Sequence, residues 1–495
     1  MMMYRVILVF LSIISIVFLE SCKTDKQVSS NPNVILVMAD DLGYGDVASY
    51  GNSHVLTPNL DDMANTAVKF ERFYAAAPVC SPTRGSCLTG RHPYRYNMPW
   101  AGKGHIPKEE ITIAEVLKTK GYATGHFGKW HVGTLSKTVK QSYFSGEVDP
   151  EQYSPPWENG FDECFSTESM MPTYNPYYMV GGDYGSNDYR FIQTEPIELG
   201  QEIDGFKWRD FYWTGEGVTI DKLEGDDSKI IMDQALDFID RQHILEKPFL
   251  SVIWFHTPHT PVVAGPEHRQ QYADYKMEEQ HWYGAITAMD EQIGRLRKYL
   301  KDNEINENTI VWFCSDNGPS YIHNINSNGG LRDKKASLFE GGIRVPAILE
   351  WPSMIKKPLI SQLISSTSDF LPSILWACGV DNAFDLPELD GENVLKNIVD
   401  NESVAEKLIF FQSPLPARLK KDEVMDAQQM AAIGMRFKLI SIDDGRSFQL
   451  YDLEKDKKEK DDVAHLYPNI VKDMKRQLED WQLSCQQSSE GKDYN

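Results

Sequence analysis

Cysteine is scarce in this chain, which holds seven cysteines among 495 residues. So few cysteines exclude a disulfide scaffold, although a single bridge stays possible. Positive charge is also in short supply, with 50 lysines and arginines against 72 aspartates and glutamates and a formal net charge of −22. We therefore expect no nucleic-acid partner, because phosphate backbones bind basic surfaces. If the substrate is anionic, the positive charge that attracts it has to be concentrated near the binding site.

Long apolar runs are rare as well. Residues 6–19 form one such run, which follows Arg5 and has the length of a secretory signal core, short of a comfortable membrane span. Ser21 and Cys22 come next, an arrangement that looks like a bacterial lipoprotein signal, in which the cysteine is acylated. We therefore expect residues 1–22 to be a lipoprotein signal peptide that ends at Cys22. A single N-terminal membrane anchor is the alternative.

Both interpretations of the N-terminus place the chain from about Asn33 onward outside the cytoplasm. With the lipoprotein signal, the protein is exported and anchored through its N-terminal lipid to a bacterial membrane, facing the periplasm or the cell surface. A hydrophobic fraction of 41% with 11% aromatics argues against disorder. A length of 495 residues favours more than one domain.

Four apolar segments of the chain end in polar residues. Residues 34–38, 249–255 and 309–314 are nearly unbroken apolar runs, and a shorter run precedes Lys129 and His131. Runs of this kind, rich in Val, Ile and aromatics, predict strands that are buried on both faces of a parallel sheet. Open sheets of this class place their sites at the carboxyl ends of the strands.

Helix-like segments separate these strands, as at residues 278–302. The alternation predicts an α/β fold, a large sandwich around a mixed, mainly parallel sheet. We expect this catalytic domain at residues 31–399, with an aromatic-rich insertion at about 136–218 whose rings either stack on sugars or only pack. Short strands and a final helix predict a smaller C-terminal α+β domain, with an antiparallel sheet, at residues 400–495.

Two of the predicted strands end in a candidate metal site. Asp40 and Asp41 follow the first strand, and Asp316 and Asn317 follow another. Oxygen ligands of high negative charge suit a hard cation and not zinc. We expect Ca²⁺, with Mg²⁺ as the second choice.

The segment CSPTRGSCLTG, at residues 80–90, carries the most specific pattern. Its Cys-x-Pro-Thr-Arg start and Leu-Thr-Gly end resemble the signature of the formylglycine-dependent sulfatases, a family of the alkaline-phosphatase-like superfamily. The segments ILVMADDLGYGD, GKWHVG, HTPHTP, SDNG and LRDKKASLFEGGIRVP are similar to further blocks of that family, in the same order. The resemblance covers most of the chain and implies the alkaline-phosphatase-like fold of a type I, bacterial polysaccharide sulfatase.

The resemblance also implies a role for each matched residue. Cys80 would be oxidised by a formylglycine-generating maturase to the aldehyde 3-oxoalanine, or formylglycine. One hydroxyl of the aldehyde hydrate would attack sulfur, and deprotonation of the other would expel sulfate. The metal site would be completed by the modified side chain, so that the ligands are Asp40, Asp41, Cys80, Asp316 and Asn317.

The remaining matched residues would bind sulfate and move protons. Arg84 would hold the hydrate and neutralise charge, and Lys129 and Lys335 would bind sulfate oxygens. His131 would deprotonate the second hydroxyl, and His259 would protonate the leaving oxygen, with Lys335 as a second candidate for that role.

Three positions in this assignment are ambiguous. Lys334 adjoins Lys335, and counting back from Glu340 favours Lys335 as the lysine that matches the family pattern. His256 also precedes a Thr-Pro pair, and the family pattern favours His259. Cys87 stands where the family has an aliphatic residue, and we expect it to be a small buried hydrophobe.

The resemblance implies an enzyme that hydrolyses sulfate esters of a sulfated carbohydrate. The candidates are algal polysaccharides such as ulvan or carrageenan, and host glycosaminoglycans, and nothing in the sequence ranks them. Two alternatives are open: a formylglycine-dependent phosphonate or phosphate ester hydrolase, and a non-catalytic protein that binds sulfated glycans if Cys80 is not matured.

Overall fold

The computed structural model describes residues 31–138, 150–176, 211–215, 217–218, 223–320, 327–380, 386–401, 407–419 and 427–494. The predicted lipoprotein signal with Cys22 and much of the predicted insertion at 136–218 lie outside these ranges. Within the described residues, no helix combines the length and the hydropathy needed to cross a membrane.

The larger part of the molecule is built on one mixed sheet, which has eleven strands in the described ranges. The main path through the sheet runs β10-β2-β9-β8-β1-β7-β3-β4-β5-β6, and β11 pairs with β2 beside β10. The strands are β1 (Asn33–Ala39), β2 (Val68–Tyr74), β3 (Ala123–Lys129), β4 (Glu163–Thr167), β5 (Trp213–Thr214), β6 (Gly217–Val218), β7 (Phe249–Trp254), β8 (Thr309–Ser315), β9 (Arg344–Glu350), β10 (Leu359–Ser361) and β11 (Ser365–Ser366).

The centre of this sheet is parallel, as predicted. β8, β1, β7, β3 and β4 are parallel neighbours, whereas β9 runs antiparallel to both β8 and β2. The four apolar runs of the sequence form β1, β3, β7 and β8, and nearly every residue of these strands is buried. β4 lies inside the segment expected to be an insertion; its five residues carry no long apolar run, so the sequence did not mark this strand.

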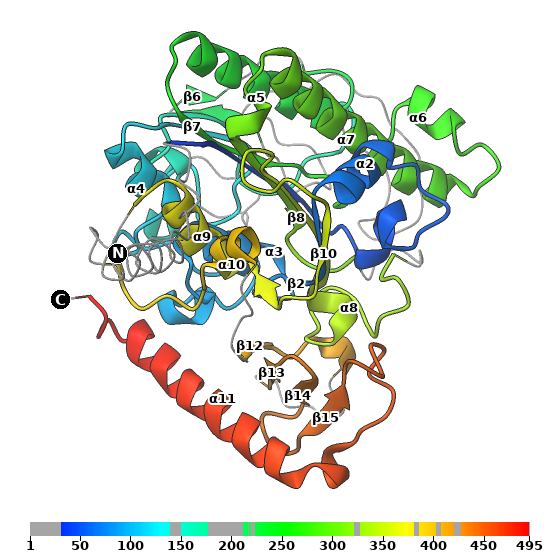
Figure 1. Cartoon of the computed structure of the whole chain (residues 1–495), viewed down its shortest axis with the longest axis vertical. Coiled ribbons are helices and arrows are strands. Elements are labelled where there is room, and N and C mark those ends of the chain that lie inside the picture. The colour runs from blue at the N-terminus through cyan, green and yellow to red at the C-terminus, as the bar shows by residue number, and fades with distance from the viewer. Residues whose placement is uncertain are drawn as a thin grey trace, which may run out of the picture.

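Helices cover both faces of the sheet, as Figure 1 shows. Alternate residues of β1 point to opposite faces: Leu36 packs in a cluster with α3, α4, α9 and α10, and Val37 packs in a cluster with α2, α5 and α7. The helices are α2 (Pro58–Thr66), α3 (Cys80–Thr89), α4 (Ile113–Thr119), α5 (Asp227–Ile244), α6 (Pro266–Gln270), α7 (Met277–Asp302), α8 (Glu340–Ile343), α9 (Phe370–Ala377), α10 (Val394–Asp400) and α11 (Pro468–Ser489).

A second, antiparallel sheet occupies the C-terminal part of the chain, at the bottom of Figure 1. One of its faces packs on α11, and the other packs on residues of the first part, including Leu338, Phe339 and Ile343. This is the α+β arrangement that the sequence predicts for the C-terminus. Its strands are β12 (Ile409–Pro414), β13 (Gln428–Ile433), β14 (Phe437–Ser441) and β15 (Gln449–Asp452).

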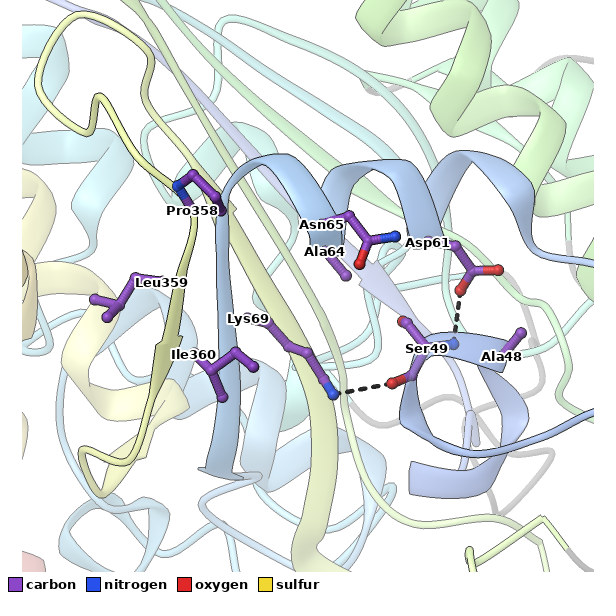
Figure 2. Close-up of a pocket in the computed structure, with 9 residues that line it drawn as sticks. All are labelled: Ala48, Ser49, Asp61, Ala64, Asn65, Lys69, Pro358, Leu359 and Ile360. Carbon is purple, nitrogen blue, oxygen red and sulfur yellow. Dashed lines mark hydrogen bonds between the residues drawn. The ribbon is translucent and has the colours of Figure 1, made fainter.

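A pocket of about 570 Å³ opens beside the edge strand β10, between α2 and β2. Figure 2 shows the Lys69 ammonium donating to the backbone oxygen of Ser49 at 2.9 Å, and Asp61 accepting from the Ser49 N–H at 2.7 Å. No predicted site residue lines this pocket, so it is distinct from the site described below. The lining residues are Ala48, Ser49, Asp61, Ala64, Asn65, Lys69, Pro358, Leu359 and Ile360.

Candidate active site

The four predicted metal ligands of the chain follow two neighbouring strands. β1 and β8 are parallel, and their last residues, Ala39 and Ser315, lie opposite each other. The next two residues of each strand therefore leave the sheet side by side. All four are buried: Asp40, Asp41, Asp316 and Asn317.

Hydrogen bonds tie these strand ends together. The backbone N–H of Asp41 donates to Asp316 Oδ1 at 3.1 Å, and the side-chain amide of Asn317 donates to Asp41 Oδ1 at 2.6 Å. Asp41 has a φ of 62°, in the left-handed region that residues other than glycine seldom adopt. Backbone of this kind collects at functional sites, where surrounding contacts hold it.

Cys80 faces this cluster from the first turn of α3. Its side chain is buried, and the Lys335 ammonium donates to Cys80 Sγ at 3.3 Å and to Asp41 Oδ1 at 2.5 Å. Residue 80 thus stands at a helix N-terminus, whose backbone N–H groups and dipole favour negative charge. Burial raises the pKa of the Cys80 thiol to about 12, against the opposing charges of Lys129 and Lys335, so the unmodified thiol is protonated at neutral pH.

Arg84 joins the helix of Cys80 to the ends of two strands. It lies four residues after Cys80, on the same face of α3, and is fully buried. Its Nε and Nη2 donate to Asp316 Oδ2 at 3.1 and 2.6 Å, and its Nη1 donates to the Lys129 carbonyl at 3.0 Å. These bonds fix the guanidinium in the site.

Lys129 and His131 come from the end of β3. The Lys129 ammonium donates to Asp40 Oδ2 at 2.6 Å and is fully buried. His131 has a φ of 57° and is buried in the same cluster. Burial, and then the positive charges of Lys129 and Arg84, hold the pKa of His131 well below its usual range, so its imidazole is neutral at pH 7.

His259 approaches the cluster from the loop after β7. Its Nε2 lies 3.8 Å from Asp41 Oδ2, and its Nδ1 lies 2.6 Å from the Thr260 carbonyl. Its side chain keeps 13% of its surface exposed, in contrast to the deeper His131. Burial lowers the pKa of His259 to about 4 in the substrate-free site.

The two ambiguous neighbours lie elsewhere. His256 is fully buried, with Nδ1 2.8 Å from Asp227 Oδ2 and Nε2 2.7 Å from Thr167 Oγ1. The charge of Lys334 acts on Asp46, which lies in the η1 turn (Tyr44–Asp46). The structure therefore brings His259 and Lys335 to the cluster.

The residues present fit a hard cation. Two buried oxygens of the cluster, Asp40 Oδ1 and Asn317 Oδ1, accept no hydrogen bond from the described residues. Burial and the neighbouring Asp40 carboxylate raise the pKa of Asp316 to about 7, a sign of crowded carboxylates whose repulsion a cation relieves. One ligand atom each from Asp40, Asp41, Cys80 and His259 lie within 4.8 Å of one another.

The structure adds supporting residues that lie outside the sequence motifs. Thr367 Oγ1 accepts from the Ala76 N–H at 3.1 Å and lies 2.7 Å from Ser86 Oγ on α3, which fixes the helix against the loop that leads into it. Gln429 of β13 bonds the loop that carries Lys335. Neither side chain belongs to a local pattern, so the sequence offered no signal for them.

Two family profiles match this chain. The sulfatase profile matches residues 32–380, which include every predicted site residue except Cys22. A profile described as N-sulphoglucosamine sulphohydrolase, C-terminal, matches residues 328–484, which include Lys335 and the C-terminal sheet.

Individual proteins show the same likeness. The N-acetylgalactosamine-6-sulfatase of Canis lupus familiaris is 30% identical over 401 residues, which cover 77% of this chain and 68% of the relative. The crystal structure of Ps i-CgsB in complex with k-i-k-neocarrahexaose aligns with a TM-score of 0.75 at 26% identity, over 93% of this chain and 94% of that one. A Bacteroides thetaiotaomicron protein, BT33336S-sulf, described under metabolism of multiple glycosaminoglycans, aligns with a TM-score of 0.71 at 25% identity, over 92% of this chain and 100% of that one.

Proposed function

Since the chain belongs to the sulfatase family and is a sulfuric ester hydrolase, we propose that it removes sulfate from a sulfated carbohydrate and that residue 80 acts as formylglycine. The observation that carries the proposal is the placement of Cys80. It begins α3 with its sulfur 3.3 Å from the Lys335 ammonium, beside the carboxylates at the ends of β1 and β8. A nucleophile at this position would lie next to an anionic ester that is bound by positively charged groups.

Two relatives support a carbohydrate substrate. The canine relative is named for N-acetylgalactosamine-6-sulfate chemistry, and Ps i-CgsB was crystallised with k-i-k-neocarrahexaose. The family as a whole is broader, because it includes a human steryl-sulfatase that is 29% identical to this chain. Carbohydrate is therefore the proposed class, and the individual glycan, with ulvan, carrageenan and glycosaminoglycans as candidates, is left to experiment.

Charge in the site supports an anionic substrate despite the net charge of the chain. Three carboxylates, of Asp40, Asp41 and Asp316, meet three basic groups, of Arg84, Lys129 and Lys335. A Ca²⁺ ion held by Asp40, Asp41, Asp316 and Asn317 would add two positive charges and would polarise the sulfate and acidify the attacking hydroxyl. The cluster would then carry a net positive charge of about two, which attracts a sulfate monoester locally.

The chain's own residues orient the ester. Arg84 is held by Asp316 and by the Lys129 carbonyl, so its guanidinium cannot swing away when substrate binds. The Lys129 ammonium bonds Asp40 and the Lys335 ammonium bonds Asp41, so the two groups can donate to different sulfate oxygens. An aldehyde hydrate at residue 80 would supply two hydroxyl groups, one to attack sulfur and one to lose a proton when sulfate leaves.

The two histidines differ in their surroundings, and this difference supports different proton transfers. His131 is buried and neutral, which suits a base that takes a proton from the hydroxyl on residue 80. His259 lies nearer to solvent, which suits a group that protonates the departing alcohol. Burial lowers the pKa of His259 in the substrate-free site, so His259 has to take up a proton before it can act as the donor.

The direct test of the proposed function is a comparison of ester classes. The chain is co-expressed with a formylglycine-generating maturase, and conversion of Cys80 is verified by the mass of its tryptic peptide. We expect multiple turnovers on an aryl sulfate and far slower turnover on the matching aryl phosphate and phosphonate. Faster hydrolysis of the phosphorus esters would replace this proposal with the phosphonate or phosphate hydrolase alternative.

The carbohydrate class is tested separately. Defined oligosaccharides of ulvan, carrageenan and glycosaminoglycans are incubated with matured protein, and released sulfate is measured. We expect sulfate from at least one panel member at a higher kcat/KM than from the aryl sulfate. Activity on the aryl sulfate with none on the glycans would contradict the carbohydrate class and leave the sulfatase.

We also propose that the protein is exported and anchored to a bacterial membrane by acylation of Cys22. The support is the apolar run at residues 6–19, followed by Ser21 and Cys22. In a bacterial host fed labelled fatty acid, the wild-type chain should take up label and pellet with membranes. Cys22→Ser should take up none, and label in that variant would contradict the proposal.

A further inference from the structure

Lys335 lies on a loop that has no strand or helix of its own. Residues 331–339 connect the region after β8 to α8, and the Lys335 ammonium must still reach both Asp41 and Cys80. The Lys335 N–H donates to the Pro319 carbonyl at 3.0 Å. The next N–H, of Ala336, donates to the Pro78 carbonyl at 2.7 Å, two residues before Cys80. Two successive backbone N–H groups, of Lys335 and Ala336, thus tie the loop to the segment after β8 and to the segment before Cys80.

The residue after Lys335 adopts a backbone conformation that other contacts have to support. Ala336 has a φ of 70°, and it is not a glycine. The left-handed region costs an L-residue about 1 to 2 kcal/mol, so an unsupported loop would relax to negative φ. Such a change would rotate the peptide that carries the bond to Pro78 and would move Lys335.

Gln429 of β13 supplies the support. Its side chain is fully buried, and its Nε2 donates to the Ala336 carbonyl at 2.8 Å. Its Oε1 accepts the Leu338 N–H at 2.8 Å. One side-chain amide therefore satisfies a carbonyl and an N–H of the loop, as a neighbouring strand would do.

Residues of the C-terminal sheet, together with Glu459 after β15, also hold the two ends of the loop. Arg332 Nη1 donates to the Tyr451 hydroxyl at 2.8 Å and to the Glu459 carbonyl at 2.7 Å. At the other end, the Glu340 N–H donates to Glu459 Oε2 at 2.7 Å, and the buried Lys438 ammonium donates to Glu340 Oε1 at 3.0 Å. Gln429 bonds the loop between these two anchors, at the Ala336 carbonyl and the Leu338 N–H.

We propose that Gln429 is a positioning residue of the active site, through which the C-terminal sheet sets the place of the Lys335 ammonium and of the segment before Cys80. The inference rests on the proposed function only in that sulfate is the group that Lys335 binds. It makes the C-terminal sheet part of the catalytic apparatus, although no side chain of that sheet is assigned to the substrate.

The first experiment removes the amide and keeps its length. Gln429→Met should fold, and its kcat/KM for an aryl sulfate should fall between about 10- and 100-fold, because misplacement of a binding group by about 1 Å costs rates of that order. The matched control is Gln412→Met on β12, whose amide contacts Gln482 of α11 instead of the loop. This control should retain the wild-type kcat/KM.

A double-mutant cycle separates positioning from general damage. If Gln429 acts through Lys335, adding Gln429→Met to Lys335→Ala should lower kcat/KM by less than 3-fold, because the group to be positioned is already gone. Ala336→Gly should restore part of the activity of Gln429→Met, because glycine adopts a φ of 70° without cost. If Gln429→Met does not fold, Gln429→Asn serves in its place, since it keeps the polar amide and shortens its reach by one methylene group.

The outcomes distinguish this inference from the proposed function. Equal losses in the wild-type and Lys335→Ala backgrounds, or equal losses in the Gln412 and Gln429 variants, would overturn the positioning role. A Gln429 variant that is folded and fully active would also overturn it, with the sulfatase itself unaffected. A wild-type chain with matured residue 80 that hydrolyses no sulfate ester would instead contradict the proposed function.

Discussion

Two cysteines of α3 differ in what surrounds them. Cys80 faces the Lys335 ammonium and the carboxylates, whereas Cys87, seven residues later, is fully buried in the apolar cluster around Leu36 and Trp312. Cys87 is the small buried hydrophobe that the sequence predicts. The pair therefore offers a matched comparison of the same residue type on one helix.

We predict that Cys80→Ser folds and loses turnover, because a single hydroxyl lacks the second one that releases sulfate. Cys87→Ala should keep wild-type kcat and lose about 1 kcal/mol or more of stability, as expected for a small cavity. Turnover on an aryl sulfate and the thermal midpoint of each variant are measured. Repeated turnover by Cys80→Ser, with an unmodified serine verified by mass, would contradict the mechanism.

A second pair at the residue scale is His131 and His259. His131→Ala should release about one alcohol per site and then stop, with a protein mass increased by one SO₃ unit, because the base for sulfate release is missing. His259→Ala should slow the release of the alcohol, most for sugar esters and least for activated aryl esters. Burst kinetics and intact mass are the measurements. A retained SO₃ unit in the His259 variant alone would reverse the two assignments.

At the scale of elements, the parallel pairing of β1 with β8 decides the metal site. The pairing places Ala39 opposite Ser315, so the acidic residues that follow each strand meet. A carboxylate on α7, outside this site, stabilises a helix instead. Asp290 of α7 accepts the backbone N–H groups of Asn59 and Leu60 and so caps the N-terminus of α2.

We predict that Asp316→Ala loses both the cation and activity, because one of three carboxylates is removed from the site. Asp290→Ala should lose about 1 to 2 kcal/mol of stability and should keep both the bound cation and the activity. Bound calcium per chain and turnover are measured after dialysis against calcium and again after a chelator. Wild-type calcium content in the Asp316 variant would remove this residue from the proposed ligand set.

At the scale of the whole molecule, α11 joins the C-terminal sheet to the larger part through a polar contact. His92 is buried against Trp481, with ring centroids 4.7 Å apart, and its backbone N–H donates to Asp390 Oδ2 at 2.6 Å. Arg95 pairs with the same carboxylate at 2.7 Å. Burial, against the opposing charge of Asp390, lowers the pKa of His92 to about 4.

This contact should weaken in acid. The His92 pKa is lowered on folding, so between its usual value of about 6.5 and about 4 the unfolded chain binds the proton that the folded chain excludes. Stability is therefore lost as the pH falls through this window, by about 2 kcal/mol between pH 7 and pH 5. His92→Gln should show a shallower fall, measured as urea midpoints at several pH values. An unchanged slope would exclude His92 as a source of the acid sensitivity.

Much of this molecule could be predicted from local sequence. Strands buried on both faces leave continuous apolar runs, and β1, β7 and β8 were therefore evident from residue type alone. β4 was not evident from the sequence, because this strand has only five residues and several of them are polar. The motif at residues 80–90 and the acidic strand ends likewise follow from residue order.

Only the tertiary structure decided how these pieces meet. Arg84 contacts Asp316 across 232 positions of the chain, and Gln429 contacts Ala336 across 93. No local pattern records such contacts, because a buried glutamine in a short strand has the same sequence neighbours whether it holds a loop or packs in a core. The sequence by itself determined which groups the site contains, since chemistry depends on residue type. The structure decided which of them face one another and what holds them there, since that depends on packing between segments far apart in the chain.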